Sequence, residues 1–312
     1  QALRLAVGTS PDGAEYWVPV WALVGRRRRP QVTVTAGVHG DEFEGMRALM
    51  QLAQELAPEH LHGSVVLAPM VNPTAFRAGT RPSPVDGLNL NRLFPGSPTG
   101  APSERLAHRL MEGLVQGSDL LVDLHSGGTR LLHAPLSGYY PLPGEVGRIS
   151  QEAALATGLP YVWNLPQRPG VLSFEAARAG IPATGAEIGG SGRCLGEDVA
   201  RYRQAVLGVL GYMKILRDAP RPSRHAPVVS GDWLLAAASG FFEPTVTLEQ
   251  PVKKGQVLGQ VLDPFGTTLC EVKAPRAGIV LGLRSFPTAS AGDLAVFAPW
   301  EGEEGAPPAS SI

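Results

Sequence analysis

Cysteine is scarce in this sequence of 312 residues: only Cys194 and Cys270 are present, and they form no CxxC spacing. That scarcity argues against a metal site built from thiolates and against a small secreted fold held together by disulfide bonds. An excess of charge of either sign is also missing, because 27 basic and 28 acidic side chains give a formal net charge of −1. Proteins that bind nucleic acid usually carry a clear basic excess, so we expect no nucleic-acid partner.

Long hydrophobic runs are missing as well. The longest, such as 234–238, fall far short of the roughly 20 apolar residues that a membrane-spanning helix needs. We therefore expect no membrane association, and the lack of a charged-then-apolar leader favours a cytoplasmic protein. Hydrophobic residues nevertheless make up 44% of the chain and charged residues 18%, a composition that supports a folded core.

The stretch from residue 30 to residue 218 alternates short β-branched runs with segments of helical periodicity. That alternation predicts an α/β fold with a mixed, mostly parallel sheet flanked by helices. The predicted strands cover 32–35, 65–68, 120–122, 161–165 and 183–188, and the predicted helices cover 42–56, 103–116, 145–157 and 196–217.

The remainder of the chain has a different composition. Residues 228–300 are rich in Val, Leu, Gly and Thr, with frequent turns, and predict a small C-terminal all-β domain. The segment 218–227 (DAPRPSRHAP) contains three prolines and is typical of a linker. We therefore predict a first domain at 1–218, a second at 228–300 and a frayed tail at 301–312.

Two segments of the C-terminal region resemble biotinyl/lipoyl carrier domains: VKKGQVLG at 252–259 and VKAPRAGIV at 272–280. Such domains carry a modified lysine on the hairpin between these two halves. The corresponding turn here, at 262–267, contains no lysine, so we expect no attached prosthetic group. We expect the region instead to cover a pocket mouth, to shape substrate choice or to make an oligomer contact.

Histidine and carboxylate side chains follow the predicted strands, each beside glycine. GVHGDE at 37–42 follows the first strand, and DLHSGG at 123–128 ends another. In an open α/β sheet, ligands bind beyond the carboxyl ends of the strands. Two histidines and one carboxylate with an open fourth position are the ligand set of a catalytic zinc site. The pattern therefore predicts a metal site made by His39, Glu42 and His125.

A third strand end carries AEIGG at 186–190, which places Glu187 between small residues after an apolar run. A glutamate that does not bind the metal is the usual general base in metal-assisted hydrolysis. Simpler roles stay open: Glu187 could cap a helix or form an ion pair, and Asp41 could cap the helix that follows it. The other histidines are interpreted as surface or hydrogen-bonded residues: His60, His62, His108, His133 and His225.

These motifs, together with NLNRLFPG at 89–96, resemble the succinylglutamate desuccinylase/aspartoacylase family over residues 32–217. Members of that family are zinc-dependent amidohydrolases related to the metallocarboxypeptidases, so the resemblance implies a zinc-carboxypeptidase-like fold. It also implies a single Zn²⁺ per chain, bound by His39, Glu42 and His125.

The same resemblance implies roles for several further side chains. Glu187 would activate the metal-bound water and shuttle its proton, while Asn91 and Arg92 would bind the substrate carboxylate and polarise the scissile carbonyl. Arg81 matches an upstream, substrate-binding arginine of the same loop. Chemistry supports the arginine roles, because a guanidinium holds a carboxylate through paired hydrogen bonds and stabilises a developing oxyanion. Many relatives have aspartate where this chain has Asn89, and that difference leaves the exact substrate open.

The function implied by the resemblance is hydrolysis of the amide bond of a small N-acyl amino acid, which releases a carboxylic acid and a free amino acid. Within the family, the motifs and the C-terminal β region look most like bacterial N-acetyl-diaminobutyrate deacetylases. Two alternatives stay open: a metallocarboxypeptidase acting on short peptides, and a non-catalytic metal-binding protein whose β domain docks a partner. The sequence also leaves open whether the chain forms a homo-oligomer.

Overall fold

The computed structural model describes residues 1–10, 12–219 and 226–300. Twelve strands of this described part form one large sheet: β1 (Ala2–Thr9), β2 (Glu15–Val24), β3 (Gln31–Ala36), β4 (Ser64–Ala68), β5 (Leu120–His125), β6 (Leu131–Tyr139), β7 (Tyr161–Asn164), β8 (Ala183–Gly190), β9 (Val228–Val229), β10 (Asp232–Leu235), β16 (Gly282–Arg284) and β18 (Leu294–Ala298). The strand order is β1-β2-β4-β3-β5-β8-β6-β16-β18-β10, while β7 pairs with β6 and β9 pairs with β7.

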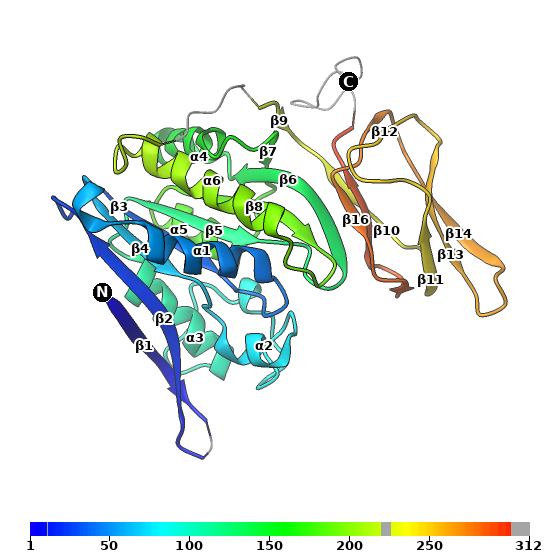
Figure 1. Ribbon diagram of the computed structural model, residues 1–312. Coiled ribbons are helices and arrows are strands. Elements are labelled where there is room, and N and C mark those ends of the chain that lie inside the picture. Colours follow the sequence, from blue (N-terminus) through cyan, green and yellow to red (C-terminus); the bar gives the residue numbers. More distant parts are fainter. Residues whose placement is uncertain (11, 220–225, 301–312) are drawn as a thin grey trace.

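Helices cover both faces of this sheet (Figure 1). They are α1 (Phe43–Glu55), α2 (Pro73–Ala78), α3 (Pro102–Leu110), α4 (Gly144–Ala156), α5 (Leu172–Arg178) and α6 (Gly196–Tyr212), with the short 3₁₀ turns η1 (Pro58–His60) and η2 (Leu90–Arg92) and the π-helical turn η3 (Met111–Val115). Side chains such as Leu49 of α1 and Val206 of α6 share a core on one face, and Leu106 of α3 and Leu172 of α5 share the core on the other. No helix in the described part is long and apolar enough to span a membrane.

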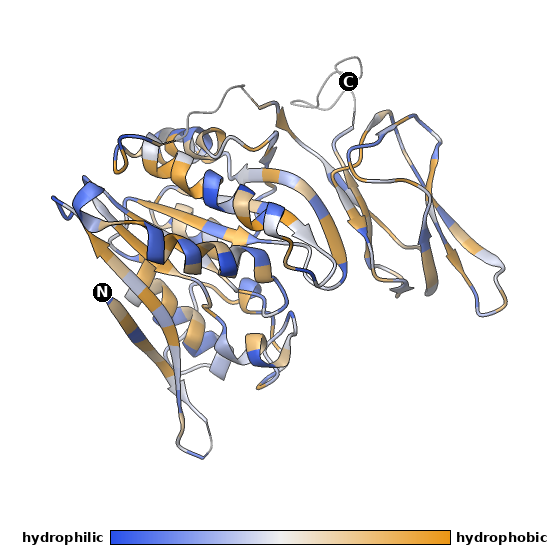
Figure 2. Cartoon of the chain, viewed as in Figure 1, coloured by the Kyte–Doolittle hydropathy of each residue, from blue (hydrophilic) through white to orange (hydrophobic). Residues whose placement is uncertain are grey.

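The centre of the sheet is parallel: β4, β3, β5 and β8 run side by side in the same direction. β3 (QVTVTA) is rich in β-branched residues, which suit a strand that is buried on both faces. Figure 2 shows these central strands mostly hydrophobic, whereas α1 and α6 alternate hydrophobic and hydrophilic residues. Because the carboxyl ends of the parallel strands share one edge, the loops that follow β3, β5 and β8 meet there.

The predicted α/β fold, with its mostly parallel centre and C-terminal antiparallel strands, is confirmed. Two of the predicted helices end earlier than predicted. The helix predicted for 103–116 is α-helical only to Leu110, because the wider π-helical turn η3 takes over there. The helix predicted for 196–217 ends at Tyr212, since Lys214 adopts a left-handed φ of 57° that an α-helix cannot continue through.

Within the described part, the residues after 226 form strands and turns and no helix, as predicted. β16 pairs antiparallel with β6, β18 with β16, and β10 with β18, so the C-terminal region extends the main sheet. The remaining strands form two small sheets: β11 (Gly240–Pro244), β13 (Val257–Leu262), β14 (Thr268–Lys273) and β17 (Thr288–Ala289) in one, and β12 (Pro251–Val252) and β15 (Gly278–Ile279) in the other. The two-domain division at 218–228 stays a prediction. Residues 220–225 of the predicted linker and the predicted tail at 301–312 lie outside the described residues.

Candidate active site

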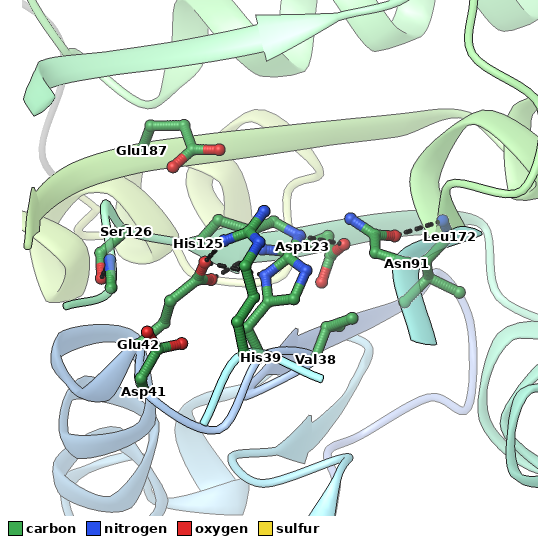
Figure 3. A network of polar contacts seen from close by, with 12 residues as sticks. Val38, His39, Asp41, Glu42, Asn91, Asp123, His125, Ser126, Leu172 and Glu187 are labelled. Carbon is green, nitrogen blue, oxygen red and sulfur yellow. Dashed lines mark hydrogen bonds and ion pairs between the residues drawn. The ribbon is translucent and has the colours of Figure 1, made fainter. Parts of the chain in front are cut away.

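Three side chains meet at the edge of the sheet where β3 and β5 end. His39 lies in the loop after β3, Glu42 immediately precedes α1, and His125 is the last residue of β5. His39 Nδ1 lies 2.8 Å from Glu42 Oε1, and His125 Nδ1 lies 2.9 Å from Glu42 Oε2. Donor atoms from the three residues all lie within 4.8 Å of one another. Figure 3 shows both rings beside the Glu42 carboxylate, so the structure brings the three predicted metal ligands together.

The loop that carries His39 depends on glycine. A Cβ at Gly40 would lie 2.0 Å from the carbonyl carbon of Ala75 in α2, so no larger residue fits there. Next to it, Asp41 Oδ2 accepts hydrogen bonds from the backbone N–H of Thr129 at 2.9 Å and from its hydroxyl at 3.0 Å. The interpretation of Asp41 as a helix cap is therefore wrong: its side chain ties the loop after β3 to the loop after β5.

Neighbouring side chains hold the distal ring nitrogens of the two histidines. His39 Nε2 lies 3.1 Å from Asn89 Oδ1, and His125 Nε2 lies 2.8 Å from Asp123 Oδ2. Each oxygen can accept a proton from Nε2, so Nδ1 of each ring faces Glu42 and is the nitrogen that a metal ion would bind. Asn89, the residue that differs from many relatives, thus orients His39 through an amide oxygen and without a charge.

The charges of this cluster determine its protonation. Burial would raise the pKa of Glu42, but His39 and His125 outweigh it and hold the pKa well below its usual range. Burial lowers the pKa of His39. Burial also acts to lower the pKa of His125, yet Asp123 and Glu42 raise it well above its ordinary value. Arg81 donates to Glu42 Oε1 at 2.8 Å. An ionised carboxylate flanked by two imidazole nitrogens can hold a divalent metal ion.

Glu187 faces the same edge from β8, where it pairs in register with His125. Its side chain is 29% exposed, yet Oε2 is buried and has no hydrogen-bond partner among the described residues. His133 Nε2 lies 3.9 Å from this oxygen. Burial raises the pKa of Glu187 to about 8, with His125 opposing the rise and Glu42 adding to it. A carboxyl group with a pKa near neutrality and an unpartnered oxygen can accept and return a proton.

Asn91 and Arg92 lie in η2, at the other side of the cluster. Asn91 Oδ1 accepts a hydrogen bond from the backbone N–H of Leu172 at 2.9 Å, which fixes the amide against the start of α5. Burial lowers the pKa of Arg92 to about 10, and the positive charges of Arg168 and Arg81 add to that effect. Neither Arg92 nor Arg168 forms an ion pair with a described carboxylate. Two unpaired guanidinium groups that repel each other make this end suited to an anion.

A cavity of about 190 Å³ joins these groups. All the predicted site residues except Glu42 line it, so one space reaches the histidines, Glu187 and the arginines. The volume is below the roughly 300–1,000 Å³ of pockets that take drug-sized ligands, which indicates a compact substrate.

Several residues that line the cavity were not predicted from the sequence. The interpretation of His133 as a surface or hydrogen-bonded residue is wrong: it is 6% exposed, and its Nδ1 has no partner in the described part. The apolar residues on either side of His133 in β6 (LLHAPL) could have indicated that this histidine is buried. Of the remaining histidines, His60, His62 and His108 are exposed or partly exposed, and His225 lies outside the described residues. The other unpredicted lining residues include Tyr140, Trp163, Arg168 and Trp233.

Comparison with known proteins identifies the class of enzyme. The protein is a hydrolase that acts on carbon–nitrogen bonds other than peptide bonds, and its reaction class is amide-bond deacylation. It belongs to the succinylglutamate desuccinylase/aspartoacylase family, because the profile of that family's catalytic domain matches residues 28–213. The resemblance seen in the sequence is thereby confirmed.

Individual relatives agree with this assignment. Over 281 residues the chain is 36% identical to the N-alpha-acetyl-L-2,4-diaminobutyric acid deacetylase of Halomonas elongata, an alignment that covers 86% of this chain and 81% of that protein. A succinylglutamate desuccinylase/aspartoacylase structure from Rhodobacter sphaeroides has a TM-score of 0.89 at 29% identity, covering 97% of this chain and 96% of that one. The product-bound ectoine utilization protein EutE (DoeB) from Ruegeria pomeroyi has a TM-score of 0.88 at 28% identity, with coverages of 96% and 94%.

Proposed function

We propose that this protein is a zinc-dependent deacylase that hydrolyses the amide bond of a small N-acylated amino acid. The observation that carries the proposal is Glu187, whose carboxyl group lines the cavity beside the histidine cluster with one buried oxygen left unpartnered. A purely structural metal site has no use for such a group, whereas a hydrolytic site needs a base. The H. elongata relative is named for N-α-acetyl-diaminobutyrate, which makes that compound the first substrate to test.

The donor set fits zinc. We propose a single Zn²⁺ per chain, held by Nδ1 of His39, Nδ1 of His125 and the Glu42 carboxylate. Catalytic zinc sites typically combine histidine and carboxylate ligands and keep a position open. When bound, the ion would supply a Lewis acid that polarises the amide carbonyl and makes water more acidic. The contacts of Asp123 and Asn89 with the distal ring nitrogens are the support that metal-binding histidines usually have.

The chain's own residues would divide the rest of the chemistry. Glu187 would take a proton from the attacking water as the new carbon–oxygen bond forms, and return it to the nitrogen as the carbon–nitrogen bond breaks. Water is thereby added across the amide, and the products are a carboxylic acid and a free amino acid. Arg92 would stabilise the negative charge that develops on the carbonyl oxygen. Arg92, Asn91 and Arg81 would hold the substrate, with the guanidinium groups binding its carboxylate.

The alternatives are weaker on specific grounds. A metallocarboxypeptidase would use the same metal chemistry, but Trp233 and Leu294 from the C-terminal strands line the cavity and leave about 190 Å³, which favours a compact substrate over a peptide. A non-catalytic metal-binding protein would not need Glu187 as a base. A cytoplasmic location stays a prediction from the sequence, and the oligomeric state stays open.

Release of free amine tests the proposal, measured on N-acetyl and N-succinyl amino acids and short peptides with zinc-loaded protein. We expect hydrolysis of an N-acyl amino acid, lost with a chelator and restored by zinc. Glu187→Gln should lower kcat by about 10²–10⁴-fold while zinc content and fold are kept. Glu145→Gln, on the exposed side of α4, is the matched control and should keep the wild-type rate. Release from peptides alone would favour the carboxypeptidase, and a folded, zinc-loaded protein without any activity would refute the proposal.

A further inference from the structure

The cavity has two chemically different ends. Figure 3 shows Asn91 on one side of the histidine pair and Ser126 and Glu187 on the other. Arg92 and Arg168 belong to the Asn91 end, where the charge of one acts on the other. If the substrate carboxylate lies at that end and the scissile carbonyl at the histidines, the acyl group must extend toward the opposite end. That second end therefore decides which acyl group fits.

Four of the lining side chains are Leu131, His133, Trp233 and Leu294, and we assign them to this second end as its wall because His133 Nε2 lies 3.9 Å from Glu187 Oε2. Trp233 meets His133 edge to face, with ring centroids 5.7 Å apart and ring planes at 80°. Phe297 packs against Trp233 with ring centroids 5.6 Å apart. Since β10 pairs with β18 and β18 with β16, the indole is supported by strands of the main sheet. The wall is thus held in place by ordered neighbours.

None of these four side chains carries a positive charge. The arginines that line the cavity are Arg81, Arg92 and Arg168. The charge of Arg81 acts on His133, but its guanidinium is held by Glu42 at 2.8 Å, and the other two arginines lie at the carboxylate end. His133 is buried, and burial lowers its pKa to about 4, so its ring is neutral at physiological pH. A negatively charged group placed against the wall would lose its water and find no cation among the wall side chains, and Arg81 is already paired with Glu42.

We infer that Leu131, His133, Trp233 and Leu294 form the acyl-group subsite, and that this subsite accepts a short uncharged acyl group such as acetyl and rejects a charged one such as succinyl. The inference rests on the proposed function, because it takes the substrate carboxylate to bind at Arg92. Trp233 and His133 limit the length of the acyl group, since their rings occupy the space beside Glu187. Because the wall side chains carry no positive charge, the subsite favours an uncharged acyl group. The C-terminal strands thereby contribute directly to substrate choice.

Values of kcat/KM for N-acetyl, N-butyryl and N-succinyl derivatives of the same amino acid test this inference. We expect the wild type to prefer the N-acetyl compound over the N-succinyl compound by roughly 100-fold or more. Trp233→Ala should raise the butyryl-to-acetyl ratio about tenfold, because it opens the wall. Leu131→Arg should raise the rate on the N-succinyl compound about tenfold, because the partly exposed position can direct a guanidinium into the subsite. Phe241→Ala, in β11 and 52% exposed, is the matched control and should leave the acyl profile unchanged.

Each outcome bears on the inference. A wild-type preference for the N-succinyl compound overturns it, and so does an unchanged acyl profile in folded Trp233→Ala and Leu131→Arg proteins. If circular dichroism shows that Trp233→Ala does not fold, Leu131→Arg decides alone, because a gain of succinyl hydrolysis cannot come from unfolding. Failure of the proposed function looks different: the wild type then releases amine from none of the acylated amino acids.

Discussion

At the scale of single residues, the burial of His133 should make the protein less stable in acid. Its side chain is 6% exposed, and Nδ1 has no hydrogen-bond partner within the described residues. Burial lowers its pKa from 6.5 to about 4; Glu42 opposes this fall, while Arg81 and His125 add to it. The folded protein therefore keeps the ring neutral, while the unfolded chain takes up a proton below about pH 6.5. Because the unfolded state binds more protons, the free energy of unfolding should fall as the pH drops from 6.5 toward 4.

Urea unfolding between pH 7.5 and pH 4.5 measures this contribution. We expect the loss of unfolding free energy over that range to be smaller in His133→Leu than in the wild type, by about 2–3 kcal/mol. His60→Leu, which replaces an exposed histidine, is the control and should keep the wild-type dependence on pH. The same pH dependence in all three proteins would show that His133 is not held neutral by the fold.

The candidate metal ligands could be recognised from the residues beside them in the sequence, whereas the cavity residues that were not predicted are placed by strand pairing. His39, Glu42 and His125 could be predicted because each follows a strand directly in a short glycine-flanked motif, and parallel strands bring their carboxyl ends to one edge. His133 reaches the cavity only because β6 pairs with β8, and Trp233 only because β10 joins the sheet through β18. No sequence neighbour of either residue specifies those pairings.

At the scale of elements, the loop between β3 and α1 depends on its close approach to α2. A Cβ at Gly40 would lie 2.0 Å from the carbonyl carbon of Ala75, so Gly40→Ala must push the loop or α2 aside. We expect a loss of about 1–3 kcal/mol in the free energy of unfolding. We also expect weaker zinc binding, because His39 is the adjacent residue. Urea unfolding and zinc competition against a chelating dye give the two values.

Gly196→Ala is the matched control for that experiment. Gly196 opens α6, has no positive φ, and a Cβ there would meet nothing within 4 Å. Alanine is also the better helix former, so the variant should be neutral or more stable by up to about 1 kcal/mol. If Gly40→Ala behaved like Gly196→Ala in both measurements, the close approach to α2 would not shape the site.

The elements also differ in how far the sequence predicts them. The central strands were predictable because a β-branched run buried on both faces has a strong local pattern. The ends of α3 and α6 were not, since the π-helical turn η3 and the left-handed Lys214 depend on packing rather than on composition. Helix ends are generally set by such contacts, so the discrepancy lies where the local signal is weakest.

At the scale of the whole molecule, one sheet runs through both predicted domains. Ala134 and Leu136 of β6 share a buried cluster with Val229, Leu281 and Phe297 from the C-terminal region. The alternation of apolar residues in a strand fixes which face is buried, but it does not name the partner strand. The sequence could therefore predict a C-terminal β region, although its continuity with the main sheet could not be foreseen.

A chain that ends at residue 218, the predicted boundary, should consequently fail to fold as a stable monomer. It would lose β16 from the edge of β6 and expose Ala134 and Leu136, each 1% exposed in the full chain. Exposing a large apolar side chain costs about 1.5–3 kcal/mol, and an uncovered strand edge promotes association. Light scattering and thermal unfolding should show aggregation, or a Tm lower than that of the full chain by roughly 10 °C or more. A chain ending at residue 300 keeps every described strand and should match the full protein. A monomeric chain of residues 1–218 with the full-length Tm would instead establish an autonomous domain and contradict the role given to the shared sheet.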